Sequence, residues 1–177
     1  LNICGCLLVN LLFIFFKTVT PNLGLIWNTP SIDCILPLSF SNNEIVDEVN
    51  AIIDEFGFFD DWEDKYAYLI DMGKKLEPMD EELKVEETKL RGCQSTVYFY
   101  SEKSNEGLVN FKAFSDAAIV QGLIALLLRV YNNRSSSEIL STPIEFISQI
   151  GLNEHLSVTR KNGLSSMVSA IKNAAKV

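Results

Sequence analysis

The sequence predicts an α+β domain in which a small antiparallel sheet of about three strands packs with helices before and after it. Two observations predict this class. Apolar residues recur at helical spacing over residues 44–73 and again from residue 115 to the C-terminus, whereas two runs of strand character lie between these parts. A polar turn containing glycine, Glu102–Gly107, separates the two runs, which predicts a β-hairpin.

The first two helices are predicted from apolar residues three and four positions apart. The first covers residues 44–56 and ends at Gly57, and its apolar face consists of Ile45, Val46, Val49, Ile52, Ile53 and Phe56. Asp61 is a suitable N-cap for the second, whose stripe consists of Trp62, Tyr66, Leu69 and Ile70, with Gly73 near its end. Residues 74–87 are polar and contain Pro78, so we expect a loop with at most one helical turn.

The predicted sheet follows this loop. Residues 97–100 are β-branched and aromatic, and residues 108–114 alternate between apolar and polar, so these runs predict the two strands of the hairpin. Thr88–Arg91, directly before Gly92, is the candidate for a third, short strand.

The C-terminal part is predicted to be helical from Ser115 onward. Ser115 and Asp116 favour the start of a helix to about Tyr131 that is apolar nearly all round, which predicts a central, buried position. Two capping-box patterns, Ser135-x-x-Glu138 and Thr142-Pro143-x-Glu145, predict the next helix starts. A last helix is predicted from about Thr159, and its apolar face consists of Leu164, Met167, Val168 and Ile171.

Charge and cysteine content restrict the classes of function. The formal net charge is −8 and the isoelectric point is about 4.7, and no basic patch interrupts this acidity, so we do not expect nucleic-acid binding. The cysteines, Cys4, Cys6, Cys34 and Cys93, do not form a paired disulfide framework. We therefore expect a reduced, cytoplasmic setting.

The first 40 residues differ from the rest in charge. They contain one lysine and one acidic residue, and their apolar run Leu7–Phe16 is shorter than the roughly 20 residues that span a bilayer. We expect residues 1–40 to be an N-terminal extension outside the domain, and residues 41–177 to form the domain, with no membrane role. Upstream sequence from a misassigned gene start is the favoured explanation of the extension. An export signal or anchor and an ordered extension are the alternatives.

Cys93 is the strongest candidate for a chemically reactive residue. It lies in Arg91-Gly92-Cys93-Gln94-Ser95, directly before the first predicted strand. The polar neighbours predict a loop near the surface, where Arg91 would favour the thiolate. A buried structural cysteine is the alternative, because cysteine is among the most buried residue types. The local context does not separate the two.

Other site chemistries lack the residues they need. A cysteine hydrolase needs a base beside its thiol. The single histidine, His155, lies in the loop-like stretch Asn153-Glu154-His155-Leu156, where we expect a surface or capping residue and not a catalytic base. A zinc or iron–sulfur site needs three or four soft ligands, and the predicted domain has one cysteine and one histidine, so we expect no metal. A lone reactive thiol remains, and such a group suits sulfur relay.

Several segments, in this order and spacing, resemble the SufE family over residues 56–175. They are Trp62–Ile70 with Gly73, Gly92-Cys93-Gln94-Ser95 before a hydrophobic strand, Ser115–Val120 with Gly122-Leu123, Gly151-Leu152 with His155-Leu156, and Arg160–Leu164 before a terminal helix. The resemblance implies a fold related to the IscU-type cluster scaffolds. Those scaffolds use three cysteines to hold a cluster, and this domain has one, which disfavours a scaffold function.

The resemblance also implies roles for individual residues. Cys93 matches the cysteine that accepts sulfur as a persulfide. Arg160 matches an arginine that family members place near the cysteine loop, and Asp116 matches the aspartate that starts the central helix; both are expected to serve docking or thiol handling. The neighbours of the cysteine are expected to support its loop: Arg91, Gly92, Gln94 and Ser95.

The partners follow from the same resemblance. The sulfur donor is expected to be a cysteine desulfurase of the SufS or CsdA type, which carries its own pyridoxal phosphate, so this chain needs no cofactor. The recipient is expected to be an iron–sulfur scaffold complex. The protein would then be an activator and not an enzyme by itself, and a homodimer stays open. A stand-alone thiol enzyme and a non-catalytic binding module are the alternative functions.

Overall fold

The computed structural model of the protein describes residues 44–176, so the predicted extension at residues 1–40 and its three cysteines lie outside the described residues. The order of elements is α2 (Glu44–Gly57), α3 (Trp62–Lys75), the 3₁₀ turns η1 (Glu81–Leu83) and η2 (Glu86–Thr88), β1 (Val97–Lys103), β2 (Leu108–Ser115), α4 (Ala118–Tyr131), β3 (Arg134–Ser135), α5 (Ser136–Ser141), α6 (Phe146–Gln149), α7 (Leu152–His155) and α8 (Val158–Ala174). This arrangement confirms the predicted α+β class.

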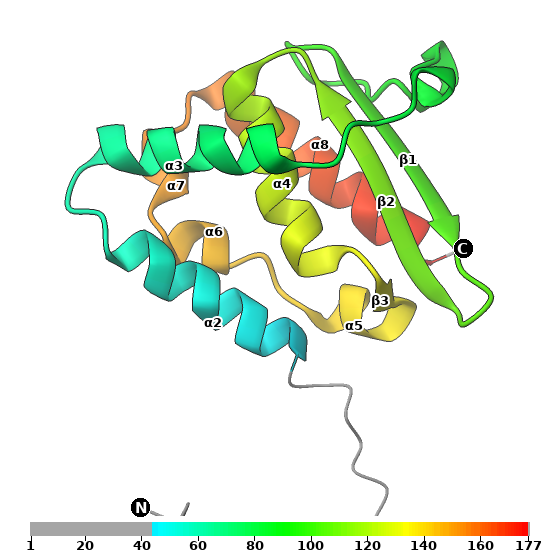
Figure 1. The fold of residues 1–177 in the computed structure, drawn as a ribbon, viewed down its shortest axis with the longest axis horizontal. Helices are drawn as coiled ribbons and strands as arrows, with labels where there is room; N and C mark the ends of the chain where they lie inside the picture. Colours follow the sequence, from blue (N-terminus) through cyan, green and yellow to red (C-terminus); the bar gives the residue numbers. More distant parts are fainter. Residues whose placement is uncertain (1–43, 177) are drawn as a thin grey trace, which may run out of the picture. The chain divides into compact units, whose positions relative to one another are not determined.

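The helix α4 is the centre of the domain. Figure 1 shows it between the sheet and the helices α2 and α3, while α8 contacts both α4 and β1. Every residue of α4 from Gly122 to Leu128 is buried, because this stretch has no polar side chain to present to water. The predicted central position of this helix is confirmed.

Two glycines allow α3 and α4 to cross in direct backbone contact. A Cβ atom on Gly122 would lie 2.8 Å from the carbonyl carbon of Leu69, and one on Gly73 would lie 2.7 Å from the backbone nitrogen of Gly122. Both separations are far inside van der Waals contact, and backbone atoms cannot move aside as a flexible side chain can. The interhelical distance therefore depends on glycine at both positions.

The sheet is antiparallel with the order β1-β2-β3, and its hairpin runs from the pair Val97 and Ser115 to the pair Lys103 and Val109. Alternate residues of β2 face the core. The third strand is not the predicted one: β3 pairs with the start of β2, whereas Lys89 of the predicted segment forms only an isolated bridge to Tyr98.

A turn after α4 explains the third strand. Asn133 adopts a left-handed backbone with φ of 56° and donates its N–H to the carbonyl of Val109, which turns the chain back along β2. At the predicted position, Thr88 closes a 3₁₀ turn, and its hydroxyl donates to the carbonyl of Leu83 at 2.6 Å. Thr88 therefore satisfies its polar groups locally and does not extend a strand.

The observed helix starts agree only in part with those predicted from the sequence. Asp61 caps α3 and Ser135 forms a capping box with Glu138, as predicted. The second predicted capping box is wrong, because the hydroxyl of Thr142 donates back to the carbonyl of Glu138 at 2.8 Å and α6 begins later. The predicted start of α4 at Ser115 is also early. Ser115 still belongs to β2, and its N–H donates to the side chain of Gln121 at 2.7 Å.

An ion cluster fastens α2 to α4. Arg129 binds Glu48, and its Nη2 donates to Glu55 Oε1 at 2.8 Å, while the hydroxyl of Tyr68 on α3 donates to Glu55 Oε2 at 2.7 Å. The three charged side chains are partly exposed, at 29% for Arg129, 31% for Glu48 and 34% for Glu55. The Arg129 guanidinium holds the pKa of the Glu55 carboxyl below its ordinary value.

Replacing Arg129 with methionine should lower the free energy of unfolding at pH 7 by about 1–2 kcal/mol, because charged hydrogen bonds are lost and two carboxylates stay close together. A depressed carboxyl pKa contributes stability above the ordinary value of 4.5, and this contribution is lost as the pH falls below it. Urea denaturation of the parent and the variant should therefore show a difference in free energy of unfolding that narrows from pH 7 toward pH 3. A difference that is constant with pH would contradict the ionic explanation.

Within residues 44–176, no helix combines the length and apolarity needed to cross a bilayer.

Candidate functional site

Cys93 lies in a short loop that is anchored to the sheet. The N–H of Leu90 donates to the carbonyl of Val97 at 2.8 Å, so residues 91–96 form a loop closed at its base. Gly92 has φ of 90°, a left-handed conformation that side chains disfavour, and a Cβ there would lie 3.0 Å from Ser166 Oγ on α8. This tight turn brings Cys93 against α8.

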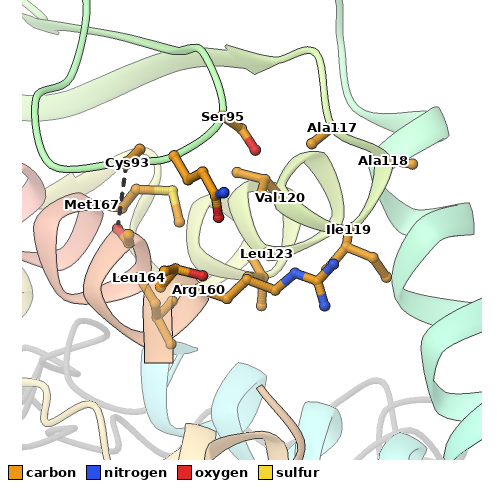
Figure 2. Close-up of a pocket in the computed structure, with 13 residues that line it drawn as sticks. Cys93, Ser95, Ala117, Ala118, Ile119, Val120, Leu123, Arg160, Leu164 and Met167 are labelled. Atoms are coloured by element: carbon orange, nitrogen blue, oxygen red, sulfur yellow. Dashed lines mark hydrogen bonds between the residues drawn. The ribbon is translucent and has the colours of Figure 1, made fainter. Parts of the chain in front are cut away.

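The Cys93 side chain borders a cavity of about 250 Å³, shown in Figure 2. Three parts of the chain meet around it: the cysteine loop, the start of α4 and the first turns of α8. The lining residues are Cys93, Gln94, Ser95, Ala117, Ala118, Ile119, Val120, Leu123, Thr159, Arg160, Gly163, Leu164 and Met167. Most of these side chains are apolar, so the sulfur lies beside a largely hydrophobic space.

The thiol is half-buried and weakly hydrogen-bonded. Cys93 Sγ donates to the backbone carbonyl oxygen of Gly163 at 3.8 Å, the contact drawn as a dashed line in Figure 2. Burial raises the pKa of the Cys93 thiol. This direction is opposite to the sequence-based expectation that Arg91 would favour the thiolate, and Arg91 is exposed and does not line the cavity. Burial therefore favours the protonated thiol over the thiolate.

Four of the predicted site residues share this cavity and three do not. Cys93, Gln94, Ser95 and Arg160 line it. Arg91, Gly92 and Asp116 are exposed outside it, although Gly92 forms the turn before the cysteine. Asp116 does not cap α4, because Ala117 holds the N-cap position.

Sequence reasoning assigned no site role to most of the apolar lining. Leu164 and Met167 were predicted as one face of the last helix, which they are, and that face ends at the cavity. The signal that was available is the spacing of Arg160, Gly163, Leu164 and Met167, which lie within two turns on one side of α8.

The described residues outside this cavity show no competing chemistry. The His155 ring stacks on Trp62, with 3.7 Å between ring centroids, and does not line the cavity. Among residues 44–176 there is also no group of three or more histidine, cysteine, aspartate or glutamate side chains arranged to hold a metal ion. Among the described residues, Cys93 is therefore the candidate nucleophile on which a function can be proposed.

Comparison with known proteins identifies a family for this chain. The family model for SufE, an Fe–S metabolism associated domain, matches residues 50–175. An uncharacterized SufE-like protein of Rhizobium etli is 44% identical over 133 residues, which cover 73% of this chain and 90% of that protein. Another SufE-like protein, from Rhizobium meliloti, is 40% identical over 132 residues, which cover 72% of this chain and 94% of that protein.

The fold is also shared with a solved structure. The solution structure of a hypothetical protein from Thermus thermophilus superposes with a TM-score of 0.61 at 18% identity, over 73% of this chain and 93% of that one. The fold, the family match and the two relatives lead to one conclusion: the chain belongs to the SufE family.

Proposed function

We propose that the domain accepts sulfur from a cysteine desulfurase as a persulfide on Cys93, stimulates that enzyme, and relays the sulfur to iron–sulfur cluster assembly. Family membership supports the association with Fe–S metabolism. The observation that carries the finer proposal is the position of the Cys93 sulfur at a mainly apolar cavity with space beside it. A simple structural cysteine would be packed on all sides.

The transfer is a thiol–persulfide exchange. The Cys93 sulfur attacks the terminal sulfur of the partner's persulfide, a new S–S bond forms at Cys93, and the S–S bond in the partner breaks. The partner's cysteine leaves as a thiolate and takes up the proton that the Cys93 thiol gives up. Atoms and electrons balance, so no external oxidant or reductant is required.

The cavity fits the storage of a reactive product. A persulfide exposed to solvent is readily oxidised or reduced, and a mainly apolar cavity beside the half-buried Cys93 gives the added sulfur a place with less solvent around it. The raised pKa of the Cys93 thiol acts in the same direction before sulfur arrives, because the protonated form is a poor nucleophile toward unrelated electrophiles. The same raised pKa means that Cys93 must lose its proton when the partner docks, before it can attack the persulfide.

The test is to measure alanine formation by a cysteine desulfurase with and without this protein, and then the intact mass of the protein. We expect faster turnover and the gain of about one sulfur atom, which a reducing thiol removes. Turnover of a substrate by this protein in the absence of any desulfurase would support the stand-alone thiol enzyme. Stimulation with no gain of sulfur would support the binding module.

Arg160 is proposed as a docking or positioning residue, because it lines the cavity beside Cys93 and is exposed. Its replacement by alanine should lower desulfurase stimulation by about tenfold, which corresponds to about 1.4 kcal/mol. The free energy of unfolding should change by less than about 0.5 kcal/mol, as for most surface sites. Lysine should rescue stimulation only in part, because it lacks the planar set of donors.

A matched control is available on the next residue. Lys161 is an exposed cation that does not line the cavity, so Lys161→Ala should stimulate the desulfurase as the parent does. If Arg160→Ala behaves like Lys161→Ala in the same assay, Arg160 has no place in the site, and the proposal rests on Cys93 alone.

A further inference from the structure

Gly163 is a glycine that the fold itself does not explain. Residues 44–176 contain seven glycines, and the conformation or surroundings of the other six give ordinary reasons for them. Gly73 and Gly122 touch backbone, Gly92, Gly107 and Gly151 have positive φ, and Gly57 is the exposed last residue of α2. Gly163 has none of these features.

Gly163 lies within α8, where it is buried and its φ is not positive. Glycine at an internal helical position is less favourable than alanine, so a reason to keep it must come from outside the helix. A Cβ on Gly163 would meet Cys93 Sγ at 3.4 Å and Cys93 Cβ at 3.9 Å. No other atom beyond the adjacent residues and the helix's own backbone lies within 4 Å of that Cβ. The missing methyl group therefore matters to one side chain, Cys93.

We infer that Gly163 keeps open the space into which the second sulfur of the Cys93 persulfide enters, an inference that rests on the proposed function. The bare Cα faces Cys93 Sγ, and the Gly163 carbonyl already holds this sulfur at 3.8 Å. An S–S bond is about 2.05 Å long, so a terminal sulfur on this side of Sγ overlaps a methyl group that only just clears the unmodified thiol. Gly163 is thus a positioning residue that discriminates between thiol and persulfide.

Gly163 acts in one step, the transfer of sulfur to Cys93. When the S–S bond to Cys93 forms and the partner's S–S bond breaks, the domain gains one sulfur atom, and the Cys93 thiol proton passes to the departing thiolate while the terminal sulfur keeps its own hydrogen. Only the product carries an additional atom beside Gly163. A methyl group there accordingly leaves the resting thiol undisturbed and hinders the transfer.

The experiment compares Gly163→Ala with Gly57→Ala, using the full chain, a cysteine desulfurase and cysteine. A methyl group added at Gly57 would have no atom within 4 Å, and Gly57 does not line the cavity. Gly163→Ala should raise the melting temperature by about 2–4 °C while lowering the maximal rate of sulfur acquisition by about tenfold to a hundredfold. The acceptor concentration that half-saturates the desulfurase should stay unchanged, and Gly57→Ala should match the parent in transfer.

The outcomes separate this inference from the proposed function. If Gly163→Ala gains sulfur at the parent's rate, or if its melting temperature falls, the inference is overturned and the proposed function stands. A parent protein that gains no sulfur from any desulfurase tested overturns the proposed function, and the inference with it. A loss of transfer together with higher thermal stability supports the inference, because damage to the fold cannot produce that combination.

Discussion

Replacing Cys93 with serine should abolish sulfur acquisition from a cysteine desulfurase. A serine hydroxyl neither forms a persulfide nor attacks one at neutral pH, so the expected loss is complete and not graded. The fold should survive, because the thiol is half-buried and its one hydrogen bond, to Gly163, is long. Intact mass after incubation with desulfurase and cysteine measures the outcome.

The control uses the remaining cysteines. A variant with serine at Cys4, Cys6 and Cys34 retains Cys93 alone and should gain sulfur as the parent does. The proposal fails if Cys93→Ser still gains a sulfur atom that a reducing thiol removes. If the triple variant gains no sulfur, the acceptor is one of the three cysteines among the first 40 residues.

The largest effect on stability is expected from Gly122→Ala, at about 3 kcal/mol or more. The added methyl group would meet the backbone of Leu69 on α3, with its carbonyl carbon at 2.8 Å, and neither helix can yield without separating from the other. Since α4 is the core of the domain, this separation would loosen contacts on both of its faces. Urea denaturation monitored by circular dichroism gives the value.

Gly57→Ala is again the matched substitution, because it adds the same methyl group to a helix where the space is open. Its free energy of unfolding should equal or slightly exceed that of the parent. A loss below about 1 kcal/mol for Gly122→Ala would mean that the two helices can move apart at little cost, contrary to their backbone contact.

The sequence predicted the elements whose signals are local. The helices α2, α3 and α8 were predicted from apolar periodicity, and α4 from a run that is apolar nearly all round. The hairpin was predicted from alternation around a polar turn. Each of these patterns lies within one segment. The strand β3 was missed because it has only two residues, and its pairing depends on the turn at Asn133. The second capping box failed since Thr142 hydrogen-bonds backward to α5.

The candidate site was predicted only in part. The local sequence left two predictions open for Cys93, a surface loop and a buried position. In the structure the side chain is half-buried. Arg160 was associated with the cysteine loop through resemblance alone. Gly163 could not be singled out, because its neighbour Cys93 is 70 residues away in sequence and a single glycine in a helix has no pattern of its own.

The hydrogen bond at the base of the cysteine loop limits how far Cys93 can extend. Leu90 is bonded to Val97, and Cys93 is three residues beyond Leu90. An extended chain covers about 3.5 Å per residue, so the Cα of Cys93 stays within about 10 Å of Leu90 while that bond persists, whatever shape the loop takes. Under the proposed function, a donor persulfide must therefore come within this distance of the base of the loop before Cys93 can attack it.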